Sequence, residues 1–125
     1  MQNGEWRMKN GDKDLPERTY QYGRRVIGLF EALPDTKLAQ ILGLQLLRSG
    51  TSVGANYREA DRGRSKAEFI SKMGDSLKEL DESSLWLRHI ADSELVSPAR
   101  LASLRSETDE LIRIFVTIIK RAKSE

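Results

Sequence analysis

Apolar residues recur every three or four positions along most of this chain, which is the spacing of amphipathic helices. The first such stripe consists of Tyr22, Val26, Phe30 and Leu33. We expect its helix to begin after Asp14, whose carboxylate would accept hydrogen bonds from the unpaired N–H groups of the first turn. Pro16 suits that turn, and Pro34 cannot continue a helix, so the first helix is predicted to end there.

A second helix is predicted from a cap at Asp35 and Thr36 to about Arg62. Its inward positions follow a heptad-like seam made of Leu42, Leu46, Ser49, Val53, Asn56 and Ala60. The seam becomes small and polar in its second half. On such a seam the Asn56 amide would need hydrogen-bond partners, because a buried polar group without them costs free energy.

Two start signals predict the third and fourth helices. Ser65 and Glu68 have the spacing of a capping box, in which each side chain bonds the other's backbone N–H, and this helix should reach about Asp92. Ser97 followed by Pro98 marks the next helix start. The third stripe consists of Phe69, Met73, Leu77, Leu80, Ser84, Leu87 and Ala91. The fourth consists of Leu101, Leu104, Thr108, Leu111, Phe115, Ile118 and Ala122.

The connections between these segments are short, so sequential helices must pack antiparallel. No segment shows the period-two alternation of a strand. The sequence therefore predicts an all-α fold, an antiparallel up-and-down four-helix bundle over residues 14–123. Residues 1–13 carry several charges and no apolar periodicity, and we expect them to form a disordered tail.

Composition narrows the class of protein. A chain of 125 residues is long enough for one domain with a real core. It has no cysteine, so disulfides are excluded and nothing indicates an oxidising compartment. The polar amino terminus lacks the apolar run of a signal peptide, and no stretch approaches about 18 consecutive apolar residues. We therefore expect a cytoplasmic protein that does not enter a membrane.

The residue patterns of common catalytic sites are absent. With one histidine, His89, and no cysteine, neither a zinc site nor a di-iron site is expected. The sequence contains no phosphate-binding glycine loop, dinucleotide fingerprint or nucleophile elbow. We expect no metal, no cofactor and no enzymatic activity. The enzymatic alternative would place unrecognised chemistry on Glu79 or Glu82, in a concave pocket with converging polar groups.

One unusual run lies in the predicted second helix. Gly50 and Gly54 sit inside an otherwise helical pattern, where each costs about 1 kcal/mol relative to alanine. Close approach of a neighbouring helix would offset this cost, since Gly50, Gly54 and Ala55 leave no bulk to hold a neighbour away.

The same helix carries a polar strip beside its seam. The strip consists of Gln45, Arg48, Ser52 and Glu59, and together with Asn56 of the seam it forms one candidate polar network. Arg48 and Glu59 are about three turns apart, too far to pair with each other, so each would pair with another helix or another subunit. Two hypotheses stay open: a structural polar network that sets helix register, which we favour, and a site for a ligand or partner.

Basic residues cluster around the second inter-helix turn. They are Arg58, Arg62, Arg64, Lys66 and Lys72. Arginine offers paired donors to phosphate, so this cluster is a candidate nucleic-acid-binding surface. Interleaved acids dilute it, and a solvated helix end is the simpler alternative. The net charge of +2 and a pI near 9.0 leave the partner open.

Four runs of this sequence carry a family resemblance. They span residues 45–60, 64–70, 77–80 and 85–88. The chain resembles, over about residues 15–122, the four-helix-bundle family encoded by intervening sequences of bacterial 23S ribosomal RNA genes. The resemblance implies a ring-like homopentamer. That family is similar to the accessory protein of diversity-generating retroelements, which binds a reverse transcriptase and nucleic acid through a basic surface.

These observations favour a non-enzymatic homo-oligomeric scaffold that associates with RNA, DNA or a nucleoprotein partner through the basic cluster. In the alternative, the chain is a protein–protein adaptor that binds no nucleic acid, and its polar strip meets the partner.

Overall fold

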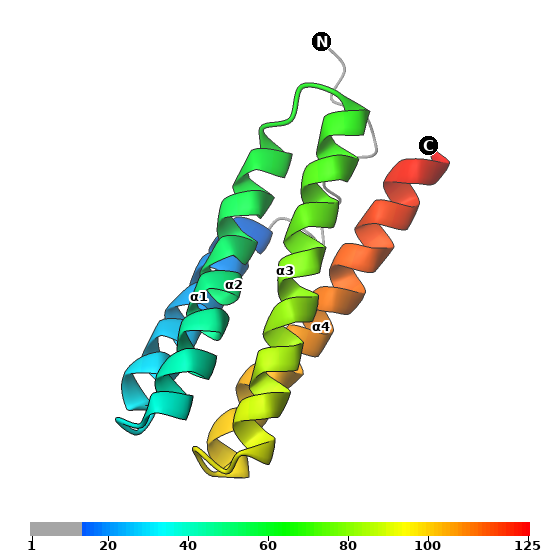
Figure 1. The fold of residues 1–125 in the computed structure, drawn as a ribbon. Coiled ribbons are helices and arrows are strands. Elements are labelled where there is room, and N and C mark those ends of the chain that lie inside the picture. The colour runs from blue at the N-terminus through cyan, green and yellow to red at the C-terminus, as the bar shows by residue number, and fades with distance from the viewer. Residues whose placement is uncertain (1–13) are drawn as a thin grey trace.

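The computed structural model of the chain describes residues 14–125. It contains four helices and, within those residues, no strand. The helices are α1 (Leu15–Ala32), α2 (Lys37–Asp61), α3 (Lys66–Asp92) and α4 (Pro98–Ser124). Successive helices run antiparallel, which places the α2–α3 turn and the carboxyl terminus at one end of the bundle (Figure 1). The predicted all-α four-helix bundle is confirmed. The expectation of a disordered tail over residues 1–13 lies outside the described residues.

Side-chain caps begin α2, α3 and α4 as predicted. The Thr36 hydroxyl accepts from the backbone N–H of Ala39 at 3.1 Å, and the Ser97 hydroxyl accepts from Arg100 at 3.3 Å. The cap predicted for α1 is wrong, because the Asp14 side chain makes no capping hydrogen bond. Asp14 has a helical backbone (φ −85°, ψ −1°), whereas a capping side chain needs an extended one to reach the first turn.

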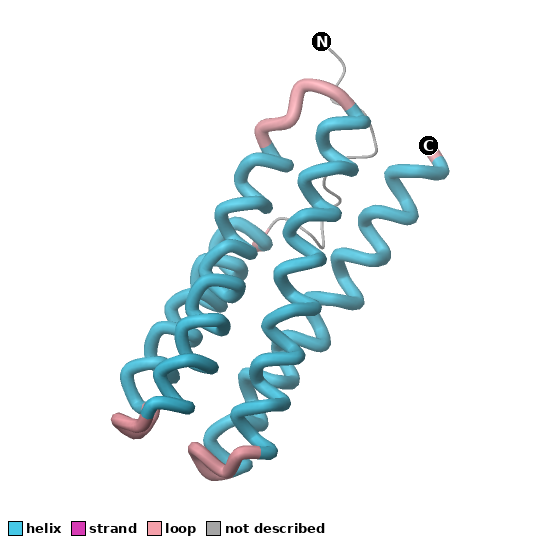
Figure 2. The backbone as a smooth tube through the Cα atoms, viewed as in Figure 1, coloured by secondary structure: helices cyan, strands magenta, loops and turns pink. Residues whose placement is uncertain are grey.

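The capping box of α3 is shifted by one residue. The Ser65 hydroxyl accepts from the Glu68 N–H at 3.1 Å, as expected. The Glu68 carboxylate, however, accepts from the backbone N–H of Arg64 at 2.7 Å rather than from that of Ser65. The box therefore also ties down the α2–α3 turn, one of the three short loops drawn in Figure 2.

A Schellman motif ends α3. Glu94 has a positive φ of 56°, and its N–H donates to the carbonyl of Ala91 at 3.0 Å. The next N–H, of Leu95, donates to Ile90 at 3.3 Å. This pattern usually places glycine at the left-handed position. The motif could not be predicted from the residue pattern, because glutamate stands at this position instead.

The core fills the space between the four helices. All seven residues of the predicted α4 stripe are buried. In α3 the stripe is partly wrong. Ile90 is fully buried in place of Ala91, and Ser76 and Ser83 are fully buried in place of Leu77 and Ser84; the three predicted residues are half-buried. The small side chains of Ser76 and Ser83 let α3 lie close to α2, and both serines bond across that contact. Ser76 donates to the Val53 carbonyl at 2.7 Å, and Ser83 lies 2.8 Å from the Ser49 hydroxyl.

Asn56 is half-buried, so its predicted place on the core seam is wrong. The neighbouring Tyr57 is fully buried and its ring lies 6.0 Å from that of Phe115 on α4. Leu42, the first residue of the predicted seam, is half-buried as well, whereas the last, Ala60, is fully buried.

The small residues of α2 partly face α1. A Cβ atom on Gly50 would lie 2.6 Å from a Val26 methyl group, so the predicted close approach is confirmed there. A Cβ on Gly54 would lie 3.4 Å from the Thr19 carbonyl oxygen, close to ordinary contact. Ala55 is exposed, so its predicted role in close packing is wrong.

Candidate functional site

Three arginines of the predicted basic cluster are exposed and available. Arg58 lies in the last turn of α2, Arg62 caps that helix, and Arg64 lies in the α2–α3 turn. Among the described residues, none forms a hydrogen bond or ion pair with these three guanidinium groups. Each can therefore offer its full set of N–H donors to a ligand.

The two lysines of the cluster are already engaged. Lys66 is half-buried and donates to the backbone oxygen of Glu125. Lys72 pairs with Glu59 at 2.8 Å, and this hydrogen bond raises the pKa of Lys72 above its ordinary value. The predicted binding cluster is thus reduced to its three arginines when the protein is alone.

A second basic segment lies at the same end of the bundle. The last turns of α4 carry Lys120, Arg121 and Lys123, and Figure 1 shows the carboxyl terminus at the end that bears the α2–α3 turn. The contact between Lys66 and Glu125 joins the two segments. The sequence alone predicts only that these cations stabilise the carboxyl-terminal end of α4 by complementing its helix dipole. Their place at the same end of the bundle as the arginines could not be found from a single helix.

The polar strip of α2 faces α3 of the same chain. Arg48 lies 2.5 Å from a Glu82 carboxylate oxygen and 3.4 Å from both oxygens of Glu79. The hydrogen bond with Glu79, and then the charge of Glu79, raises the pKa of Arg48. Glu59 pairs with Lys72 on α3. The expected pairing of Arg48 and Glu59 with another helix is confirmed.

The remaining members of the candidate polar network form no ion pair with α3. Ser52 donates to the Arg48 carbonyl at 2.7 Å within α2, Gln45 is exposed, and Asn56 is half-buried. A role for the strip in contacts with a partner stays a prediction. Glu79 and Glu82, the residues of the enzymatic alternative, direct their carboxylates at Arg48.

Ion pairing between α1 and α4 was not predicted. Arg18 forms two hydrogen bonds of 2.8 Å with Glu107 and an ion pair of 2.7 Å with Glu110. These contacts raise the pKa of Arg18, chiefly through Glu107, and the Arg18 hydrogen bond lowers the pKa of Glu110. Partners 89 residues apart leave no signal in a single sequence.

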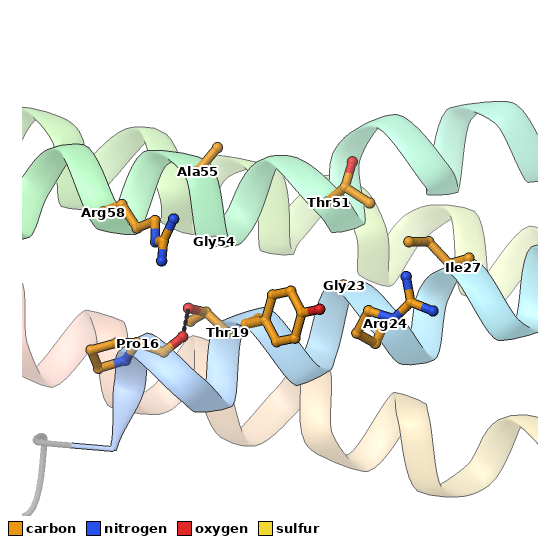
Figure 3. Close-up of a pocket in the computed structure, with 10 residues that line it drawn as sticks. Pro16, Thr19, Gly23, Arg24, Ile27, Thr51, Gly54, Ala55 and Arg58 are labelled. Carbon is orange, nitrogen blue, oxygen red and sulfur yellow. Dashed lines mark hydrogen bonds between the residues drawn. The ribbon is translucent and has the colours of Figure 1, made fainter.

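A groove of about 380 Å³ runs between α1 and α2. Its lining is Pro16, Thr19, Tyr20, Gly23, Arg24, Ile27, Thr51, Gly54, Ala55 and Arg58. Figure 3 shows Arg58 reaching from α2 toward α1 at one end and Arg24 reaching from α1 toward α2 at the other. The groove is mostly apolar and no acidic residue lines it.

Apolar side chains are exposed on one side of the bundle. Leu38, Ile41 and Leu44 of α2 are each about half exposed, at 48%, 51% and 54%. Leu44 lies one turn before Arg48, which bonds Glu82 of α3, and the exposed Leu85 follows Glu82 by three residues. We call these four residues, Leu38, Ile41, Leu44 and Leu85, the apolar face.

The structure offers no metal site within residues 14–125, where no three His, Cys, Asp or Glu side chains gather closely enough. His89 is exposed, with its ring 6.0 Å from that of Trp86. None of the four described helices is both long and apolar enough to cross a membrane.

A solved structure and a family model both relate this chain to known proteins. A solved structure of a protein with unknown function from the S23 ribosomal protein family, from Bacteroides thetaiotaomicron VPI-5482, superposes with a TM-score of 0.81. It is 31% identical and covers 87% of this chain and 97% of its own. No curated protein matches the sequence. Residues 12–117 match the family described as 23S rRNA-intervening sequence protein. The chain therefore belongs to the 23S rRNA-intervening sequence protein family.

Proposed function

We propose that this protein is a non-enzymatic, self-assembling helical scaffold that associates with RNA or DNA through the basic end of its bundle. The observation that carries the proposal is the set of three exposed arginines, Arg58, Arg62 and Arg64, that no described residue neutralises. Guanidinium groups bind phosphate through paired hydrogen bonds, and neutralising several phosphates releases counterions, which favours association.

The neighbouring cations support the same surface. Lys120 and Lys123 are exposed on the last turns of α4, at the same end of the bundle (Figure 1). Lys72 would join them only by leaving Glu59, and Lys66 only by leaving Glu125, so these two lysines contribute less. A net charge of +2 per chain is modest, and several copies in one assembly would multiply the field around this end.

Self-association is supported by the apolar face. Four large apolar side chains, each about half exposed, lie on α2 and α3 around the Arg48–Glu82 ion pair. Apolar patches rimmed by charges are typical of surfaces that a partner covers. A second copy of this chain would bury these side chains. The pentameric number implied by the family resemblance stays a prediction.

Anisotropy of a labelled, structured RNA tests the nucleic-acid part of the proposal. The titration is run at about 50 and 150 mM salt with the wild type, R62Q/R64Q and the matched control R105Q, whose arginine is exposed on α4. We expect micromolar or tighter binding that weakens with salt, is lost in R62Q/R64Q and is kept in R105Q. Binding that is absent at low salt, or equal in both variants, would contradict the proposal.

A protein–protein adaptor is the second candidate function. The apolar face favours it, because the same side chains would fit the apolar surface of a different protein. An assembled or partner-bound protein that binds no RNA at low salt would move the assignment to this adaptor.

A further inference from the structure

We propose that the groove between α1 and α2 binds a single-stranded segment of nucleic acid. This inference rests on the proposed function, because Arg58 belongs both to the basic end and to the groove. It goes beyond that function by naming the ligand class, a single strand rather than a duplex. It also assigns a binding role to two residues outside the basic cluster, Tyr20 and Arg24.

The charge of the groove selects an anionic occupant. Arg24 and Arg58 are exposed, and neither guanidinium group bonds another described residue. No carboxylate lies in the lining to compensate them. The two arginines stand at opposite ends of the groove (Figure 3), so an isolated phosphate could satisfy only one of them. An occupant with anionic groups along its length would meet both.

The aromatic residue of the groove selects a planar group. The Tyr20 side chain is 57% exposed, the most exposed of the large apolar residues in the described chain. Bases of single strands stack on such rings, whereas the bases of a duplex are already stacked inside.

The two threonine hydroxyl groups of the groove already donate within their own helices. Thr19 donates to the Leu15 carbonyl at 2.7 Å, and Thr51 donates to Leu47 at 2.7 Å. The groove therefore recognises its ligand through two guanidinium groups and one ring. These contact phosphates and the face of a base, so binding should tolerate different base sequences. A volume of about 380 Å³ falls within the range of ligand sites, roughly 300 to 1,000 Å³.

The test uses a labelled oligouridylate of about 12 nucleotides, titrated by anisotropy, with the full chain and four variants. Y20L keeps apolar bulk but removes the ring, and Y20F keeps the ring. R24Q removes one guanidinium, and R105Q is its control on another helix. All three positions, Tyr20, Arg24 and Arg105, are exposed on the surface, and thermal melts by circular dichroism check that each variant stays folded.

We expect Y20L to weaken binding roughly 5-fold to 150-fold, the range for one stacked base, and Y20F to bind like the wild type. R24Q should weaken binding and lower the slope of log K against log salt by about 0.7, while R105Q should not. Equal loss in Y20F and Y20L, equal affinity of R24Q and R105Q, or uridine monophosphate binding as tightly as the oligomer would overturn the assignment.

The structured-RNA titration in the same series separates the two proposals. If structured RNA needs Arg62 and Arg64 while the oligomer ignores Tyr20 and Arg24, the groove assignment fails and the proposed function stands. If neither nucleic acid binds, both fail.

Discussion

The Tyr22 hydroxyl on α1 lies 2.7 Å from the Thr108 hydroxyl on α4, and both side chains are buried. Thr108 donates its single proton to the Leu104 carbonyl at 2.8 Å, so Tyr22 must donate to Thr108. A second pair of buried hydroxyls lies beside it in the core, where Ser83 of α3 is 2.8 Å from Ser49 of α2. Buried hydroxyl pairs thus connect α1 to α4 and α2 to α3.

This network should contribute measurably to stability. T108V removes the acceptor of the Tyr22 proton, and we expect it to lower the free energy of unfolding by about 1 to 3 kcal/mol. Y22F removes a donor but leaves Thr108 bonded to Leu104, so its cost should be lower, about 0.5 to 1.5 kcal/mol. Urea unfolding of both variants and of the double variant measures the coupling. Strictly additive effects would show that the two hydroxyls do not act together.

The close approach of α1 and α2 can be tested at Gly50. G50A adds a methyl group 2.6 Å from a Val26 methyl, and valine in a helix has one favoured rotamer, so it cannot turn away. We expect a loss of about 1 to 2 kcal/mol, since overpacking outweighs the gain in helix propensity. G74A is the matched control. A Cβ there meets nothing within 4 Å, and that variant should gain up to about 1 kcal/mol. Stabilisation in both variants would contradict the packing described for Gly50.

Replacing Glu94 with glycine should stabilise the protein. Glu94 holds a left-handed backbone conformation at the end of α3, which costs a non-glycine residue roughly 1 to 2 kcal/mol. We expect E94G to raise the free energy of unfolding by about 1 kcal/mol, because glycine adopts this conformation without strain. Thermal melts of E94G and of the control E94A distinguish this cause from loss of the side chain. A gain of equal size in E94A would argue against backbone strain.

The ion pair between Arg18 and Glu110 predicts a dependence of stability on pH. The Arg18 hydrogen bond lowers the pKa of Glu110 in the folded protein. The resulting stabilisation is present above the ordinary carboxyl pKa, about 4.3, and is lost as the pH falls through the lowered folded value. E110Q should therefore flatten the acid limb of stability, whereas E31Q, at an exposed residue of α1 that takes no part in the Arg18 ion pairs, should not. Identical acid limbs in wild type and E110Q would contradict this contribution.

The parts of the fold that sequence predicted are those that one helix determines alone. The α4 stripe was correct throughout, because its apolar side chains repeat at helical spacing on both sides of Thr108. In α3 a serine at position 76 looked polar, and only the approach of α2 makes it a core residue that bonds Val53. The Schellman turn at Glu94 was hidden by the absence of glycine.

In the candidate site, too, only the residues that are neighbours in the sequence could be predicted. The arginines around the α2–α3 turn are near one another in the sequence, so their clustering was visible there. The groove joins Arg24 of α1 to Arg58 of α2, and the basic end joins α2 to the last turns of α4. These relationships exist only after the helices pack. Lys72 was predicted to contact a ligand, but in the folded chain it pairs with Glu59 instead.

Sedimentation velocity of the protein, alone and with a labelled structured RNA, tests the central claim most directly. It reports the mass of the assembly and whether RNA travels with it. The account predicts a discrete homo-oligomer without RNA, and a labelled RNA that co-sediments with it at low salt and separates from it as salt increases. A monomer at all concentrations, with RNA sedimenting at its free rate, would contradict it.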